Sequence, residues 1–226
     1  MSVAENYKRV QLKVKEAAER RGGSPESVKI IAISKRHPNE SIYQGIKAGI
    51  TDFGENRVQE AIQKVEEIQE AVNWHFIGTL QKNKIKYIIN KFCLIHSVDT
   101  LALAEALNNQ AEKNNTSFNI LMQLNISREE VKHGFEAENA LQEAKKIMAL
   151  KNLNLKGVMG MAPWLEDIEK TRPYFKELKD VSNVMNKAGI EAPEISMGMS
   201  GDYEIAIEEG STMVRVGTAI FGTRQY

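Results

Sequence analysis

The sequence predicts an α/β fold in which eight parallel strands and their helices close into a single (β/α)8, or TIM, barrel with an extra N-terminal helix. Eight short apolar runs alternate with amphipathic segments, which is the pattern of a parallel sheet. The runs are nearly continuous in apolar residues, as expected when helices cover the sheet. No linker or charge block divides the chain, so we expect one domain over residues 1–226. An open doubly wound sheet is the main alternative, since strand count alone does not exclude it.

The expected elements follow one another in a regular order. The N-terminal helix carries apolar residues at helical spacing and stops at Gly22 and Gly23. Strands are expected at 28–34, 52–54, 74–78, 93–98, 119–126, 155–161, 194–199 and 212–218. Helices are expected at 39–49, 57–71, 81–91, 101–113, 136–150, 165–188 with a bend at Pro173, and 201–209. The 226 residues make a short barrel, because such domains usually need about 250 residues.

Composition and charge exclude several classes of protein. A hydrophobic content of 42% argues against a disordered chain. Thirty basic residues balance thirty acidic ones, which argues against an electrostatic nucleic-acid binder. No run approaches the roughly 18 apolar residues of a membrane span. The single cysteine, Cys93, cannot form an internal disulfide, and it indicates a reducing compartment such as the cytoplasm.

Polar residues gather where the expected strands end, which is the functional end of such a barrel. Lys35 directly follows an apolar run, so its amine could be partly desolvated and could attack a carbonyl group. The alternative is an ordinary lysine that reaches solvent. Arg215 lies inside the apolar run 213–216, where an arginine must be paired with an acid or face a ligand. Both interpretations remain open at this point.

Two glycine-rich turns suggest an anion site. Residues 196–202 lead into a helix, and 216–219 follow the last strand; small residues there expose backbone N–H groups that suit a phosphate. The alternative is that Ser200 only caps a helix and Gly217 only forms a turn. His96 ends the fourth strand and is a candidate site residue, whereas His75 is expected in the core. The four histidines do not have the spacing of metal ligands.

Seven motifs, in order along the chain, resemble those of one family. They are IAISK (31–35), FGENRVQE (53–60), WHFIGTLQKNK (74–84), HSVD (96–99), GVMGMAP (157–163), SMGMSGD (196–202) and VRVGTAIFG (214–222). Together they resemble the pyridoxal phosphate homeostasis proteins (the YggS/PROSC family). The resemblance runs from about residue 5 to the end of the sequence. Arg36 and His37 after the lysine, and Gly160, depart from the commoner family pattern; they lie near the expected pocket and could tune affinity.

The resemblance implies a single barrel similar to that of alanine racemase, which is the type III fold of pyridoxal phosphate proteins. It implies pyridoxal 5′-phosphate bound as an imine to Lys35, with phosphate contacts from Ser200 and from the backbone of Gly217 and Thr218. Arg215 would face the pyridine nitrogen. The remaining pocket residues implied are Asn56, His96, Ser97 and Met199.

The implied role is control of the free cofactor and of vitamin B6 and amino-acid balance, without turnover of a substrate. A carboxylate at the pyridine nitrogen would keep the ring protonated as an electron sink, and an arginine does not. The alternative is an amino-acid racemase or related enzyme that uses the same imine. We expect no second domain, a monomer, and pyridoxal-phosphate-dependent apoenzymes as recipients of the cofactor.

Overall fold

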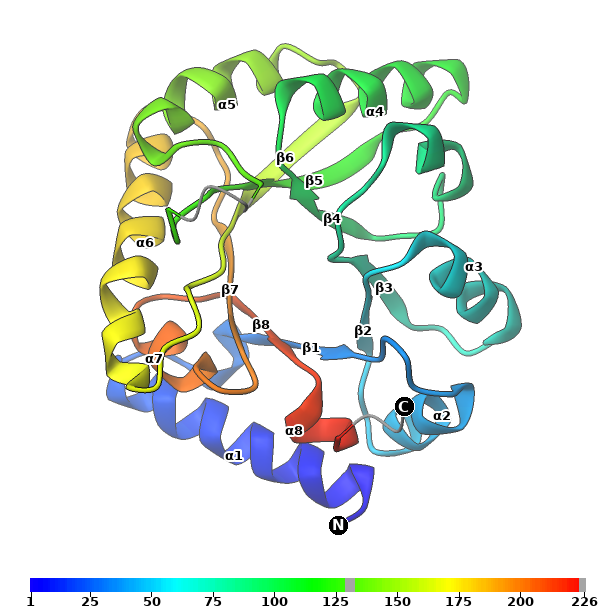
Figure 1. Cartoon of the computed structure of the whole chain (residues 1–226), viewed down its shortest axis with the longest axis vertical. Helices are drawn as coiled ribbons and strands as arrows, with labels where there is room; N and C mark the ends of the chain where they lie inside the picture. The colour runs from blue at the N-terminus through cyan, green and yellow to red at the C-terminus, as the bar shows by residue number, and fades with distance from the viewer. Residues whose placement is uncertain (129–132, 224–226) are drawn as a thin grey trace.

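The computed structural model describes residues 1–128 and 133–223, and within them eight parallel strands form a closed barrel. Strands pair in sequence order, and β1 pairs with both β2 and β8, which closes the ring. The ring and the helices outside it are seen in Figure 1. The strands are β1 (Lys29–Ile33), β2 (Asp52–Glu55), β3 (Asn73–Phe76), β4 (Leu94–Val98), β5 (Phe118–Gln123), β6 (Leu153–Met159), β7 (Glu194–Met199) and β8 (Met213–Val216). The predicted barrel is therefore confirmed, and the open sheet is excluded.

The α-helices lie on the outside of the barrel (Figure 1). They are α1 (Val3–Arg20), α2 (Asn39–Lys47), α3 (Val58–Glu67), α4 (Leu101–Lys113), α5 (Ala140–Met148), α6 (Arg172–Lys187), α7 (Tyr203–Glu208) and α8 (Thr218–Phe221). The extra helix α1 starts at a capping box, in which Ser2 accepts from the backbone of Glu5 and Glu5 accepts from that of Ser2. Its Asn6 side chain donates to the Ile220 carbonyl, which joins the first helix to the last.

The structure differs from the predicted elements in several places. The segment after β3 is a 3-10 helix (η2, Lys82–Tyr87) rather than an α-helix; it buries Ile85, and Ile88 lies buried three residues later, at the 3-10 repeat. Pro173 lies in the first turn of α6 instead of bending a longer helix, and a separate 3-10 turn (η4, Ile168–Thr171) precedes it. Two further short elements were not predicted, η1 (Pro25–Ser27) and α8, and η3 (Ala137–Asn139) replaces the start of a predicted helix.

Apolar side chains fill both sides of the strand ring. Two large clusters pack between the strands and the helices, and a smaller one fills the barrel interior. The interior cluster comprises Ile31, Ile33, Leu94, Leu121, Met159 and Met213. The interior also contains polar side chains, among them His75, His96 and Arg215, none more than 4% exposed. No helix in the described part of the chain is long and apolar enough to cross a membrane.

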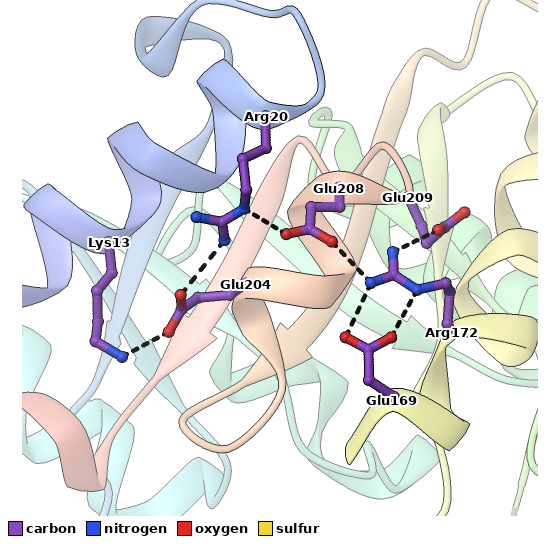
Figure 2. A network of polar contacts seen from close by, with 7 residues as sticks. All are labelled: Lys13, Arg20, Glu169, Arg172, Glu204, Glu208 and Glu209. Carbon is purple, nitrogen blue, oxygen red and sulfur yellow. Dashed lines mark hydrogen bonds and ion pairs between the residues drawn. The ribbon is translucent and has the colours of Figure 1, made fainter. Parts of the chain in front are cut away.

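An ion-pair network fastens α1 to the helices beside it (Figure 2). Arg20 of α1 donates to Glu208 of α7 at 2.7 Å, and Arg172 of α6 contacts the other oxygen of Glu208 at 2.8 Å. The network also includes Lys13, Glu169, Glu204 and Glu209. Because three helices share these pairs, the network holds α1 against the β7 and β8 side of the barrel.

Candidate functional site

A cavity of about 420 Å³ opens where the barrel strands end. Its lining comes from seven of the eight strands or the loops that follow them. The lining residues are Ile33, Lys35, Asn56, Ile77, Gly78, Thr79, Gln123, Met161, Met199, Ser200, Gly201, Arg215, Gly217 and Thr218. The structure thus brings together Lys35, Asn56, Met199, Ser200, Arg215, Gly217 and Thr218, seven of the residues named from the sequence.

Lys35 lies two residues after the end of β1 and is half-buried at the cavity. Ser34, the residue before it, is fixed by two hydrogen bonds. Its hydroxyl donates to Glu55 at 2.6 Å, and its carbonyl accepts from the Lys64 ammonium at 2.8 Å. Lys64 also contacts Glu55 and Glu60, each at 2.7 Å. Because Ser34, Glu55 and Lys64 are all buried, this cluster fixes the backbone from which Lys35 extends.

The turns after β7 and β8 meet at the Ser200 hydroxyl. Its oxygen accepts from the backbone N–H of Gly217 at 3.1 Å and of Ala219 at 3.4 Å. The turn before it is closed by Asp202, which accepts from the N–H of Met199 at 2.6 Å. Gly198 there has a φ of +91°, which favours glycine. Backbone N–H groups and a hydroxyl converging at one point are the chemistry that holds a phosphate.

Arg215 of β8 lies at the cavity with its guanidinium group buried. It donates to the Ser196 hydroxyl at 2.6 Å and to the Gly160 carbonyl at 3.1 Å. No carboxylate of the described residues lies within ion-pair distance. Burial lowers the pKa of Arg215 to about 10, with the charge of Asp202 opposing this, so the group stays charged at neutral pH. The structural ion pair, one of the two alternatives for Arg215, is therefore wrong, and the N–H groups that do not bond Ser196 or Gly160 remain to contact a ligand.

His96 and Ser97 do not line the cavity, contrary to the expectation from the resemblance. Both belong to β4 and are buried. The His96 ring makes hydrogen bonds with both nitrogens inside the barrel, and the Ser97 hydroxyl donates to the Gly78 carbonyl in the wall. A bulge between β4 and β5 changes the register at Val98. His96 therefore lies in the barrel interior and Ser97 contacts the strand wall, and neither lines the cavity.

Gln123 lines the cavity although it was not predicted as a site residue. The fifth strand was expected to run to residue 126, three residues beyond Gln123. The strand ends at Gln123, and Leu124 forms an isolated bridge with Phe135. The Gln123 side chain donates to the His133 carbonyl at 2.8 Å. A polar residue after the run ILM was the only signal in the sequence.

Comparisons with known proteins agree with this site. Residues 5–225 match the family described as the N-terminal domain of alanine racemase. The pyridoxal phosphate homeostasis protein of Aquifex aeolicus is 40% identical, over 100% of both chains. That of Escherichia coli is 38% identical, over 99% of this chain and 97% of the other. The chain belongs to the pyridoxal phosphate homeostasis protein family. The resemblance in its sequence motifs is thereby confirmed.

Solved structures share the fold of this chain. PipY of Synechococcus elongatus, solved with pyridoxal phosphate bound, is 33% identical over 98% of this chain and 100% of its own, with a TM-score of 0.85. An alanine racemase of Clostridium difficile is 17% identical, with a TM-score of 0.75, over 96% of this chain and 57% of its own. At that identity the likeness to the racemase shows the shared fold alone.

Proposed function

We propose that this protein binds pyridoxal 5′-phosphate covalently through Lys35 and releases it again, as part of cofactor, vitamin B6 and amino-acid homeostasis. One observation carries the proposal: an amine, an anion-holding turn and a buried cationic donor lie on one cavity. The family supports the same ligand, because PipY was solved with pyridoxal phosphate bound.

The cavity residues fit the chemical groups of this cofactor one by one. Lys35 matches the aldehyde, and Ser200 with the backbone of Gly217 and Thr218 matches the phosphate. Arg215 matches the pyridine nitrogen as a hydrogen-bond donor. A Cβ on Gly201 would meet nothing within 4 Å, which leaves room beside the phosphate turn. The volume of about 420 Å³ lies within the roughly 300–1,000 Å³ of small-molecule sites.

Lys35 would hold the cofactor through one reversible condensation. Its amine nitrogen adds to the aldehyde carbon, a C=N bond forms, and the aldehyde oxygen leaves as water. Release is the reverse reaction with water, or exchange with the amine of another molecule. A carrier needs no further chemistry. We infer that the recipients are apoenzymes that need this cofactor, and that the protein works as a cytoplasmic monomer.

The cavity supports a carrier rather than a racemase. Racemisation moves a proton from one face of a carbon to the other, so it needs acid–base groups on both faces. Among the described residues that line the cavity, Lys35 and Arg215 are the only ones with titratable side chains. Arg215 is a poor base because it stays charged at neutral pH. One base is insufficient for rapid turnover.

The direct test is the Lys35→Ala variant. We expect the wild-type protein to turn yellow with pyridoxal phosphate, and borohydride reduction followed by peptide mass spectrometry to place the adduct on Lys35. The variant should lose both the colour and the adduct. Lys82→Ala, which removes an exposed lysine outside the cavity, is the matched control and should keep both. An adduct that persists in Lys35→Ala would refute the assignment.

A second measurement distinguishes a cofactor carrier from an amino-acid racemase. The loaded protein, incubated with single L-amino acids, should show no sustained formation of the D-isomer by chiral chromatography. Turnover on the order of 1–1,000 per second is typical of enzymes. Rates in that range would reject the carrier and favour the racemase.

A further inference from the structure

A chain of hydrogen bonds crosses the interior of the barrel from its amino-terminal end to the cavity. It starts at Asp52 of β2, whose carboxylate lies 3.0 Å from Nε2 of His75. Nδ1 of His75 lies 3.0 Å from Nε2 of His96. Nδ1 of His96 lies 2.9 Å from the hydroxyl of Ser196, which accepts from Nη1 of Arg215 at 2.6 Å. The five residues come from β2, β3, β4, β7 and β8, so the link from His96 to Ser196 spans the barrel.

The chain is shielded from water along most of its length. Both histidines and Ser196 are at most 1% exposed, and Asp52 and Arg215 are 6% and 4% exposed. Other polar groups approach at both ends: the Gly160 carbonyl lies beside Arg215, and Thr51 and Asn73 bond the Asp52 carboxylate. Lys29 lies 3.6 Å from the Asp52 carboxylate, and the Cys93 sulfur lies 3.4 Å from Nε2 of His75. Burial raises the pKa of Cys93 to about 11, so this thiol stays protonated.

The two groups at the ends of this series of hydrogen bonds, Asp52 and Arg215, set the direction of every hydrogen bond in it. An arginine can only donate and a carboxylate can only accept. Burial raises the pKa of Asp52, but the hydrogen bonds from His75 and Thr51 outweigh it and hold the pKa at about 2. Nε2 of His75 must therefore carry a proton. With neutral rings, Nδ1 of His75 then accepts from Nε2–H of His96, and Nδ1 of His96 accepts from the Ser196 hydroxyl.

An additional proton on the histidine pair would disrupt this order. A His75 cation would donate to Nε2 of His96, and His96 would have to donate to Ser196. The Ser196 oxygen would then accept from both His96 and Arg215, and its own proton would lose its acceptor inside the barrel. A buried donor without an acceptor is costly. Burial, and after it the charges of His75 and Arg215, also lower the pKa of His96 well below its usual range.

We infer that Asp52, His75, His96 and Ser196 are positioning residues for Arg215, forming a one-directional relay that fixes its guanidinium at the cavity. In the relay, Nη1 of Arg215 donates to the Ser196 oxygen, whose own proton points toward His96. The relay ends at the Asp52 carboxylate, which is negatively charged, whereas no described carboxylate lies within ion-pair distance of Arg215. The Gly160 carbonyl holds the second nitrogen. The remaining donors are thereby aimed at the cavity. The consequence for the cofactor rests on the proposed function, but the relay itself does not.

The test is histidine ¹⁵N NMR of the cofactor-free protein, in which protonated and bare ring nitrogens have distinct shifts. His37→Gln and His133→Gln identify the signals of the other two histidines by subtraction. We expect His75 and His96 each to carry a single proton, on Nε2. A proton on Nδ1 of either ring, or two protons on His75, would overturn the relay.

Asp52→Asn tests whether the carboxylate sets the direction. An amide can present either an oxygen or an NH2 group to His75, so the direction is no longer imposed, and Nδ1–H signals should appear. Glu194→Gln is the matched control, because Glu194 lies at the same end of the barrel and bonds Thr212 instead. It should keep the wild-type signals. Wild-type signals in Asp52→Asn would refute the role of the carboxylate.

Ser196→Ala connects the relay to the ligand. The variant removes the acceptor of Arg215, so the dissociation constant for pyridoxal phosphate should rise at least fivefold. Ser182→Ala removes a buried serine of α6 outside the relay and should bind as the wild type does. An unchanged affinity in Ser196→Ala would refute the positioning role. Failure of the wild type to bind pyridoxal phosphate would instead refute the proposed function and leave the NMR result standing.

Discussion

At the scale of single residues, the charge of Arg215 decides what chemistry the cavity can support. A guanidinium group that stays charged while buried is a permanent hydrogen-bond donor. Facing the pyridine nitrogen of the cofactor, as proposed, it would leave that nitrogen as an acceptor, whereas a carboxylate would keep it protonated. The ring would then be a weaker electron sink. This would favour holding the cofactor over using it, which agrees with the single base among the described residues that line the cavity.

Ser200 is the residue that most directly tests the phosphate site. Its hydroxyl lies where two backbone N–H groups of the β8–α8 turn converge. Ser200→Ala should weaken binding of pyridoxal phosphate by about 1–3 kcal/mol, the scale of a hydrogen bond to a charged group. Titration with pyridoxal, which lacks the phosphate, is the control and should show little difference between the two proteins. Equal affinities for pyridoxal phosphate would place the phosphate elsewhere.

At the scale of elements, a buried cluster behind the cavity joins β1, β2 and α3. Lys64 of α3 contacts Glu55 of β2 and the backbone of Ser34 at the end of β1. Burial raises the pKa of Glu55, and Lys64 counteracts it. One oxygen of Glu55 has no hydrogen-bond partner among the described residues. The carboxylate of Glu55 is therefore compensated by one ammonium group, that of Lys64, together with the hydroxyl of Ser34, and both contacts hold the segment that carries Lys35.

Lys64→Met should destabilise the protein by about 3–5 kcal/mol at neutral pH, because it leaves a buried carboxylate without its counter-charge. The pKa of Glu55 would rise further above its unfolded value. A raised pKa of an acid favours the folded state at low pH, so the loss should shrink toward about pH 5. Urea unfolding at the two pH values measures both effects.

The double variant Glu55→Gln/Lys64→Met is the control for that experiment. It removes the charge together with its partner, so it should recover part of the stability lost in Lys64→Met. Equal stability of the two variants would show that the loss came from packing of the lysine chain rather than from the uncompensated charge.

At the scale of the whole molecule, closure of the ring brings the two ends of the chain to one site. β1 and β8 pair in the register Ile31 with Arg215 and Ala32 with Val216. Lys35 and Gly217 consequently reach the same cavity although 182 positions separate them in the sequence. The site therefore requires that all neighbouring strands of the barrel stay paired.

Gly157→Ala tests one of these strand pairs, that of β6 with β7. A Cβ at this position of β6 would lie 1.8 Å from the Glu194 carbonyl oxygen of β7, so the strands would have to separate. We expect a loss of about 3 kcal/mol or more in urea unfolding, at or above the usual range for overpacking. Gly201→Ala, whose Cβ would meet nothing within 4 Å, is the matched control and should unfold near the wild-type midpoint. Equal midpoints would contradict the close approach.

The sequence predicted the eight strands because the apolar pattern of a strand, and the residues at which helices begin and end, are local properties of the chain. The helix over 101–113 has the predicted bounds, and strand 194–199 does as well. The predicted element types and bounds were wrong where tertiary packing determines them. The segment after β3 is a 3-10 helix whose buried Ile85 and Ile88 are three residues apart, and β5 ends at Gln123, after which Leu124 bridges to Phe135.

The identities of Lys35, Ser200 and Arg215 as site candidates came from the sequence, since residues at strand ends share one end of a parallel barrel. Only the tertiary structure placed His96 beneath the cavity and linked it to Asp52 and Arg215. Those contacts join residues up to 100 positions apart, through side-chain orientations that depend on the pleat and tilt of the closed ring. Strand spacing fixes which end of a barrel a residue occupies, but only closure of the ring decides which side chains meet across its interior.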